Sequence, residues 1–264
     1  MKSDPQAVPP LAADLTEDAF LDGRLRLRQF RRGHRSGHDA MLLAAATPAR
    51  SHDQVVEFGA GAGAAALALA CRVPDIVLTL VEIDSELAAL AQDNAALNGI
   101  VARAVPLDVA AAPTAFAAAG LPPDHADIVL MNPPFNPGGR HQSSPDAARK
   151  TAHVAAADTL EVWIGAARRL LKPRGTLTLI WRAEGLADVL AALARGFGAI
   201  VVIPVYPDPA SAAIRVLVRA TKGSRGPMAL DQGLVLNDAA GAPTKQAADV
   251  LGGRLGLPLP GREA

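Results

Sequence analysis

The stretch at residues 127–135, DIVLMNPPF, ends an apolar run with side chains that could bind a ligand. Isoleucine, valine and leucine in succession are typical of a strand that is buried on both faces of a sheet. Pro133 and Pro134 have no backbone N–H, so they end the strand. Asn132 and Phe135 then offer a carboxamide for hydrogen bonding and a ring for stacking at the carboxyl edge of the sheet, where open α/β folds bind ligands. On its own, NPP is equally compatible with a loop that contains an Asn-Pro turn.

A second set of candidate residues lies at 54–71, where a strand, a glycine loop and a helix follow one another. Gly59, Gly61 and Gly63 form a G-x-G-x-G turn, in which glycine allows positive φ and lets a ligand approach the backbone. Glu82 closes the next apolar run 23 positions after Gly59. That spacing is close to the ~20 expected for an acid that holds ribose hydroxyls. Together these features predict a cofactor that contains adenosine, although the loop alone would also suit NAD or FAD.

Glu57 narrows the choice of cofactor. It precedes the first glycine of the loop by two positions, so its carboxylate is expected near the loop. A negative charge there would disfavour a dinucleotide pyrophosphate and would attract the ammonium and sulfonium groups of S-adenosylmethionine.

The elements that must position these residues alternate between strand and helix. The pattern predicts further helices near 85–99, 158–171 and 184–196, and further strands near 75–84, 102–109, 176–181 and 199–207. This alternation implies a parallel sheet with right-handed crossovers. Residues 211–223 have the alternation and basic end of an outer, antiparallel strand, and the tail is expected to form a short hairpin and a helix around 244–251.

The amino-terminal part is expected to be flexible at 1–16 and to form a basic segment at 17–50 that packs on the core. Leu25 and Leu27 alternate with arginines there, which is the period of a half-exposed strand. Asp39 directly precedes an apolar helical run and is therefore expected to be the N-cap of that helix.

Composition limits the class of protein. The 26 basic and 26 acidic residues cancel, so no global field indicates a nucleic-acid partner, and any such contact must be local. The single cysteine excludes an internal disulfide and fits a reducing compartment. The amino terminus lacks the apolar core of a signal peptide, and no apolar stretch is long enough to span a bilayer. His34 and His38 are four positions apart without an evident third ligand. We therefore predict a soluble cytoplasmic protein without a membrane or metal partner.

The motifs EFGAGAG, VEID, PLDV and MNPPF, in this order, resemble the amino-methylating S-adenosylmethionine-dependent methyltransferases. Three further stretches, FRRGHRSGHDAMLLAAA, PVYPDPASAAIRVLVRATKGSRGP and LVLND, resemble the bacterial family that methylates N6 of adenine-37 in the anticodon loop of valine tRNA. The resemblance implies a Rossmann-like class I α/β fold with a mostly parallel seven-stranded sheet, an antiparallel last strand and helices on both faces. It places the methyltransferase domain at 51–264, within one domain overall.

The resemblance also implies individual roles for the cofactor site. The three glycines would wrap the methionine part, Glu82 would hold the ribose, Ile83 would lie on the adenine ring, and Asp108 would accept from the adenine amine. The full set of implied cofactor residues is Asp39, Glu57, Gly59, Gly61, Gly63, Glu82, Ile83 and Asp108. Many relatives have aspartate in place of Glu57, which keeps the charge but has a longer side chain.

On the substrate side, the implied catalytic residues are Asn132, Pro133, Pro134 and Phe135. The Asn132 side-chain oxygen and the Pro133 carbonyl would accept the two hydrogens of adenine N6 and draw the flat nitrogen toward tetrahedral geometry. Phe135 would stack on the base. The anticodon loop offers an unstacked base more readily than a duplex does.

Eight basic residues are candidates for binding the tRNA phosphates, although the same density is equally typical of a solvated charged face. They are Arg24, Arg26, Arg28, Arg31, Arg32, Arg35, Lys222 and Arg225.

Four other functions remain as alternatives. Glutamine N5-methylation of release factors uses NPPY rather than NPPF and comes with a separate helical domain that is missing before the glycine loop. Guanine N2-methylation of ribosomal RNA also uses NPPF. An NAD-dependent dehydrogenase would leave Asn132, Pro133 and Pro134 without a role. A non-catalytic RNA-binding descendant is disfavoured by the intact glycine loop and NPPF.

Overall fold

The computed structural model describes residues 14–32, 35–134 and 145–257, so the predictions for His34 and Phe135 lie outside the described residues. Seven strands of its central sheet follow the order β5-β4-β3-β6-β7-β9-β8. These strands are β3 (Gln54–Phe58), β4 (Val77–Glu82), β5 (Ala102–Pro106), β6 (Ala126–Met131), β7 (Leu171–Arg182), β8 (Phe197–Tyr206) and β9 (Arg215–Lys222). Strand β9 is antiparallel to both of its neighbours, and the other pairings are parallel. The predicted fold class is confirmed.

Two predictions about the carboxyl-terminal third are wrong. Strand β9 lies between β7 and β8 rather than at the outside of the sheet. Its polar residue Arg219 suggested a half-exposed strand, but this side chain is only 3% exposed. The expected hairpin is also absent from the described tail, because β10 (Ala229–Leu230) and β11 (Leu234–Val235) each pair in parallel with β8.

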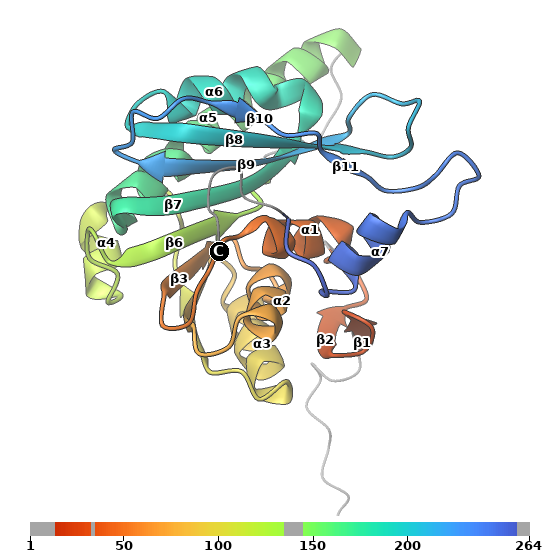
Figure 1. Ribbon diagram of the computed structural model, residues 1–264. Coiled ribbons are helices and arrows are strands. Elements are labelled where there is room, and N and C mark those ends of the chain that lie inside the picture. The colour runs from red at the N-terminus through yellow and green to blue at the C-terminus, as the bar shows by residue number, and fades with distance from the viewer. Residues whose placement is uncertain (1–13, 33–34, 135–144, 258–264) are drawn as a thin grey trace, which may run out of the picture.

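Helices cover both faces of the sheet (Figure 1). One layer contains α1 (His38–Ala46), α2 (Ala64–Arg72) and α3 (Ser85–Leu97), and the other contains α4 (Pro113–Ala118), α5 (Pro145–Leu170) and α6 (Leu186–Leu193). Successive strand residues point to opposite layers, as Val55 and Val56 do, because side chains alternate along a strand. Helix α4 is not among the helices predicted from the sequence; Pro113 starts it, where its missing N–H costs nothing.

The amino-terminal segment forms a hairpin of β1 (Leu15–Phe20) and β2 (Leu25–Phe30). Residues 15 and 16 therefore belong to a strand rather than to a flexible stretch. Leu25 and Leu27 are fully buried and belong to the same apolar cluster as α1 and α2. The short helix α7 (Lys245–Leu251) packs on this layer too (Figure 1).

Candidate cofactor and substrate site

The carboxyl ends of β3, β4, β5 and β6 meet at one edge of the sheet because these strands are parallel. This arrangement brings the glycine loop, Glu82, Asp108 and Asn132 to a common edge, although they are up to 73 positions apart in the chain. The site predicted from separate motifs is therefore assembled by the topology of the sheet.

The glycine loop uses its three glycines for different purposes. Gly59, Gly61 and Gly63 have φ values of 65°, 54° and 87°, in the left-handed region that favours glycine. A Cβ on Gly59 would meet the ring of Trp163 at 2.5 Å, so this glycine serves the packing of α5 against the loop. Around Gly61, by contrast, a Cβ would have no described atom within 4 Å. Gly61 is thus the position where the loop backbone is open to a ligand.

Glu82 lies beside this open position and is almost buried. Its Oε2 accepts from the Gly61 amide at 2.8 Å, and its Oε1 accepts from the Asp84 amide at 3.0 Å. The next residue, Ile83, is 66% exposed, which is unusual for a large apolar side chain next to a site. An acid and a bare apolar surface therefore stand next to each other at the end of β4.

Glu57 has a different environment from the one its sequence position suggested. Its carboxylate is buried against α2, where Oε2 accepts from the Ala66 amide at 2.9 Å. Burial raises the pKa of Glu57 to about 8; the Ala66 hydrogen bond lowers this pKa, and the nearby charge of Glu82 raises it. Burial therefore favours the neutral form of Glu57, which weakens the negative charge that was expected to attract the cofactor; its role in cofactor binding stays a prediction.

Asn132 carries an unusual polar atom. Its Oδ1 is buried and has no hydrogen-bond partner among the residues that the structure describes. An unsatisfied buried acceptor costs about 1–3 kcal/mol, so such atoms are uncommon in folded proteins. Pro133 is buried and Pro134 is exposed, which fixes the backbone that follows β6. The arrangement leaves an oriented acceptor for an N–H donor from outside the chain.

Asp39 does not cap α1, because the helix starts after Gly37 and Asp39 lies in its first turn. The Asp39 Oδ2 instead accepts from Nε of Arg215 at 3.0 Å. Arg215 pairs across the sheet with Arg182, the last residue of β7, so both arginines stand at the carboxyl edge. Sequence reasoning did not bring Arg215 to this edge, because its location follows from the insertion of β9 beside β7.

The structure divides the eight predicted basic residues into groups. Arg26 and Arg28 both pair with Glu17, and Arg35 pairs with Asp18 at 2.6 Å.

Arg24 donates to the backbone carbonyls of Leu21 and Gly252. Arg31 and Arg32 are exposed at the end of β2. Lys222 and Arg225 lie at the opposite edge of the sheet, since Lys222 pairs with Phe197, the first residue of β8.

A family model described as "Methyltransferase small domain" matches residues 36–204, which is more than half of the chain. The chain belongs to this methyltransferase family. A curated relative from Tolumonas auensis, named tRNA1(Val) (adenine(37)-N6)-methyltransferase, is 31% identical over 186 residues, or 68% of this chain and 72% of the relative.

Two solved structures extend the comparison. A predicted O-methyltransferase from Agrobacterium tumefaciens is 31% identical with a TM-score of 0.70, covering 83% of this chain and 98% of the other. A 16S rRNA N2 methyltransferase from Thermus thermophilus, solved with AdoMet and guanosine, is 20% identical with a TM-score of 0.53, covering 79% and 50% of the two chains, and supports the fold alone. The protein is therefore a class I methyltransferase, with S-adenosylmethionine as the methyl donor that this class uses.

The carboxyl edge of this methyltransferase fits its cofactor. The open backbone at Gly61 allows close approach of the ligand, Glu82 offers carboxylate oxygens, and Ile83 offers an apolar surface. The role of each residue in holding the cofactor stays a prediction. Within residues 14–32, 35–134 and 145–257, no three His, Cys, Asp or Glu side chains are grouped so that they could hold a metal ion. No helix in the same described ranges is long and apolar enough to cross a membrane.

Proposed function

We propose that this methyltransferase transfers a methyl group to the exocyclic N6 of an adenine in tRNA, with adenine-37 of a valine tRNA as the target. The buried Oδ1 of Asn132, which has no partner among the described residues, carries the proposal, because it offers an acceptor to an N–H donor of the substrate. The name of the Tolumonas relative supports the choice of adenine and of tRNA.

The proposed chemistry addresses a poor nucleophile. The lone pair of an adenine N6 is delocalised into the ring, which keeps the nitrogen flat and weakly reactive. Asn132 Oδ1 and the Pro133 carbonyl would each accept one of the two N6 hydrogens, and the lone pair would then point out of the ring plane. S-adenosylmethionine would supply an electrophilic methyl group on its sulfonium; as the N–CH3 bond forms the S–CH3 bond would break, and neutral S-adenosylhomocysteine would leave. The prolines hold both acceptors in place, so most of the rate gain would come from alignment. The product nitrogen would release its extra proton to water.

A neutral carboxamide suits this position better than a carboxylate. An aspartate at position 132 would bring a full charge to the buried position that the carboxamide oxygen occupies. A charge of that kind costs more to bury than an amide. The amide also attracts the sulfonium less strongly, so it stays directed at the N6 hydrogens.

The basic hairpin is the proposed RNA contact. The segment from Asp14 to Arg35 contains six arginines against four carboxylates, an excess of two positive charges in a chain that is neutral overall. Arg31 and Arg32 follow β2, and among the described residues no ion pair joins either of them to a carboxylate. Their guanidinium groups would meet phosphates of the anticodon stem-loop while the target base leaves its stack.

The deciding experiment is methylation of purified valine tRNA transcripts with radiolabelled S-adenosylmethionine, followed by nucleoside mass spectrometry. The expected product is N6-methyladenosine, formed on the natural transcript and lost when adenine-37 is replaced by guanine. Total tRNA, ribosomal RNA and release factor are tested in parallel. Label recovered as N2-methylguanosine, as methylglutamine or on a hydroxyl group would overturn the proposal and assign the enzyme to one of the other acceptor classes.

A further inference from the structure

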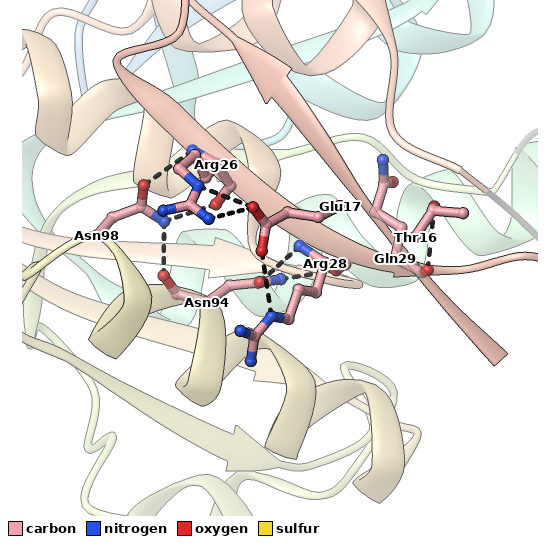
Figure 2. A network of polar contacts seen from close by, with 7 residues as sticks. All are labelled: Thr16, Glu17, Arg26, Arg28, Gln29, Asn94 and Asn98. Carbon is pink, nitrogen blue, oxygen red and sulfur yellow. Dashed lines mark hydrogen bonds and ion pairs between the residues drawn. The ribbon is translucent and has the colours of Figure 1, made fainter. Parts of the chain in front are cut away.

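Asn94 of α3 and Asn98, the C-cap residue of this helix, bind the free edge of the hairpin strand β2 (Figure 2). Asn98 accepts from the Arg26 amide at 2.9 Å and donates to the Arg26 carbonyl at 2.7 Å. Asn94 accepts from the Arg28 amide at 2.8 Å and donates to the Arg28 carbonyl at 2.9 Å. Each carboxamide thus behaves as a peptide group of a neighbouring strand would.

The two asparagines can both reach β2 because the rise of the helix between them is close to the rise of two strand residues. Four residues of an α-helix rise about 6 Å. Two residues of a strand rise about 6.6 Å. Asn94 and Asn98, four positions apart, therefore meet every second residue of β2. At Arg26 and Arg28 the N–H and C=O groups of β2 point away from β1.

Asn94 makes one bond that Asn98 does not. Its Nδ2 also donates to the carbonyl of Ala62, at 3.0 Å, and the whole side chain is buried. Ala62 lies in the glycine loop between Gly61 and Gly63, and the Gly61 amide donates to Glu82. Hydrogen bonds of Asn94 therefore connect the hairpin backbone to Ala62, and the backbone from Ala62 to Gly61 connects Asn94 to Glu82 of the cofactor site.

The direction of β2 gives this connection a consequence for RNA. Strand β2 runs along α3 from the level of Asn98 to the level of Asn94, which is the end beside the glycine loop. Arg31 and Arg32 follow directly after β2 at that end. The part of the hairpin proposed to meet phosphates is thus the part held by Asn94.

We infer that Asn94 is a positioning residue that couples RNA binding to cofactor binding. Ordering of the glycine loop by the cofactor would hold the Ala62 carbonyl in place, and through Asn94 it would hold the hairpin in its binding position. Such coupling is reciprocal, so RNA must raise cofactor affinity by the same factor, typically about 5- to 150-fold. The RNA part of this inference rests on the proposed function.

The first test compares Asn94→Ala with Asn98→Ala. Both substitutions remove the two bonds that a carboxamide makes with β2, but only Asn94→Ala removes the bond to Ala62. The dissociation constant of S-adenosylhomocysteine is measured by calorimetry with and without valine tRNA. In the unsubstituted protein and in Asn98→Ala, tRNA should tighten the binding by about 5-fold or more. In Asn94→Ala the ratio should fall to near one. Equal ratios in the two variants would overturn the inference.

The second test needs neither RNA nor a variant. Hydrogen exchange of the unsubstituted protein is followed with and without S-adenosylhomocysteine. The inference requires slower exchange in a peptide that covers residues 24–32 as well as in the glycine loop. Protection of the loop with an unchanged hairpin would refute the coupling, even if Asn94→Ala fails to fold. A protected hairpin in a protein that binds no tRNA would refute the proposed substrate and the RNA part of the inference, and would leave the connection between the glycine loop and the hairpin intact.

Discussion

The backbone of Gly59 packs directly against the indole ring of Trp163, so that a Cβ on Gly59 would stand 2.5 Å from Cη2 of the tryptophan. Trp163 in turn makes an edge-to-face contact with Phe58, with ring centroids 6.4 Å apart. The indole thereby connects α5 with the loop that is expected to hold the cofactor. Gly61, two residues later, has a similar left-handed backbone but no described neighbour at the same place.

Alanine at these two glycines should therefore differ in its effect: Gly59→Ala should mainly reduce stability, and Gly61→Ala should mainly reduce cofactor binding. Both substitutions strain the left-handed backbone by about 1–2 kcal/mol. Gly59→Ala adds overpacking against Trp163, typically about 1–3 kcal/mol more, so its free energy of unfolding in urea should fall further. Gly61→Ala should lose less stability and more affinity for S-adenosylhomocysteine, because its methyl group enters the open side of the loop. Equal stabilities of the two variants would contradict this assignment.

Removal of the Asn132 carboxamide should separate activity from stability. Asn132→Ala deletes a buried acceptor that has no partner in the described part of the chain, so the melting temperature should stay unchanged or rise. The turnover number should nevertheless fall by about 100- to 1,000-fold, the usual cost of losing one aligned electrostatic group. Cofactor affinity, measured by calorimetry, serves as the control and should be retained. A strong loss of stability would mean that Asn132 has a structural partner instead.

The buried Glu57 should make stability depend on pH. Its pKa is about 8 in the folded protein against an ordinary value of 4.5, so between these two values the folded state binds more protons than the unfolded state. The free energy of unfolding should therefore fall as pH rises through this window, by up to about 1.4 kcal/mol for each pH unit. Glu57→Gln keeps an acceptor for the Ala66 amide and should flatten the curve. Urea titrations at pH 5, 6, 7 and 8 measure the two slopes; parallel curves would be evidence against a protonated Glu57.

The arginines that follow the hairpin and the basic residues at the end of β9 should differ in their contribution to tRNA binding. Glutamine at both Arg31 and Arg32 should weaken binding and reduce the slope of log K against log salt, by about 0.7–0.9 for each phosphate that is no longer neutralised. Lys222→Gln/Arg225→Gln removes the same charge from the opposite edge, where Lys222 already pairs with Asp124 at 2.7 Å. This second variant should leave the slope unchanged. The slopes of the two variants are compared by filter binding between 50 and 200 mM salt, where such interactions weaken strongly. A smaller slope for the Lys222/Arg225 variant would restore those residues to the RNA surface.

Much of the fold follows from local patterns. The strand–glycine–helix unit, the acid after β4 and the proline stop after β6 each depend on residues that are close together in the chain. Their meeting at one edge follows from parallel pairing alone, so the sequence was sufficient to predict it. The strand β1 and the helix α4 were missed because their short sequences carry little periodicity.

Features that depend on tertiary contacts could not be read in this way. Asn94 and Asn98 look like ordinary polar residues of an amphipathic helix until β2 is placed beside them. Likewise Arg215 reaches Asp39 only because β9 enters between β7 and β8. The environment of Glu57 depends on how α2 begins, where the Ala66 amide draws the carboxylate away from the open side of the loop. Long-range pairing of this kind has no local signal in the chain.

The interior location of β9 affects how the chain can be made. During synthesis β7 and β8 leave the ribosome before the strand that joins them, so each presents an unpaired edge to the surrounding solution. The gap closes only once Lys222, the last residue of β9, has emerged. Until then the unpaired edges of the nascent protein can pair with other chains. Slow translation of residues 207–222 would therefore lengthen the time during which the chain is prone to aggregate.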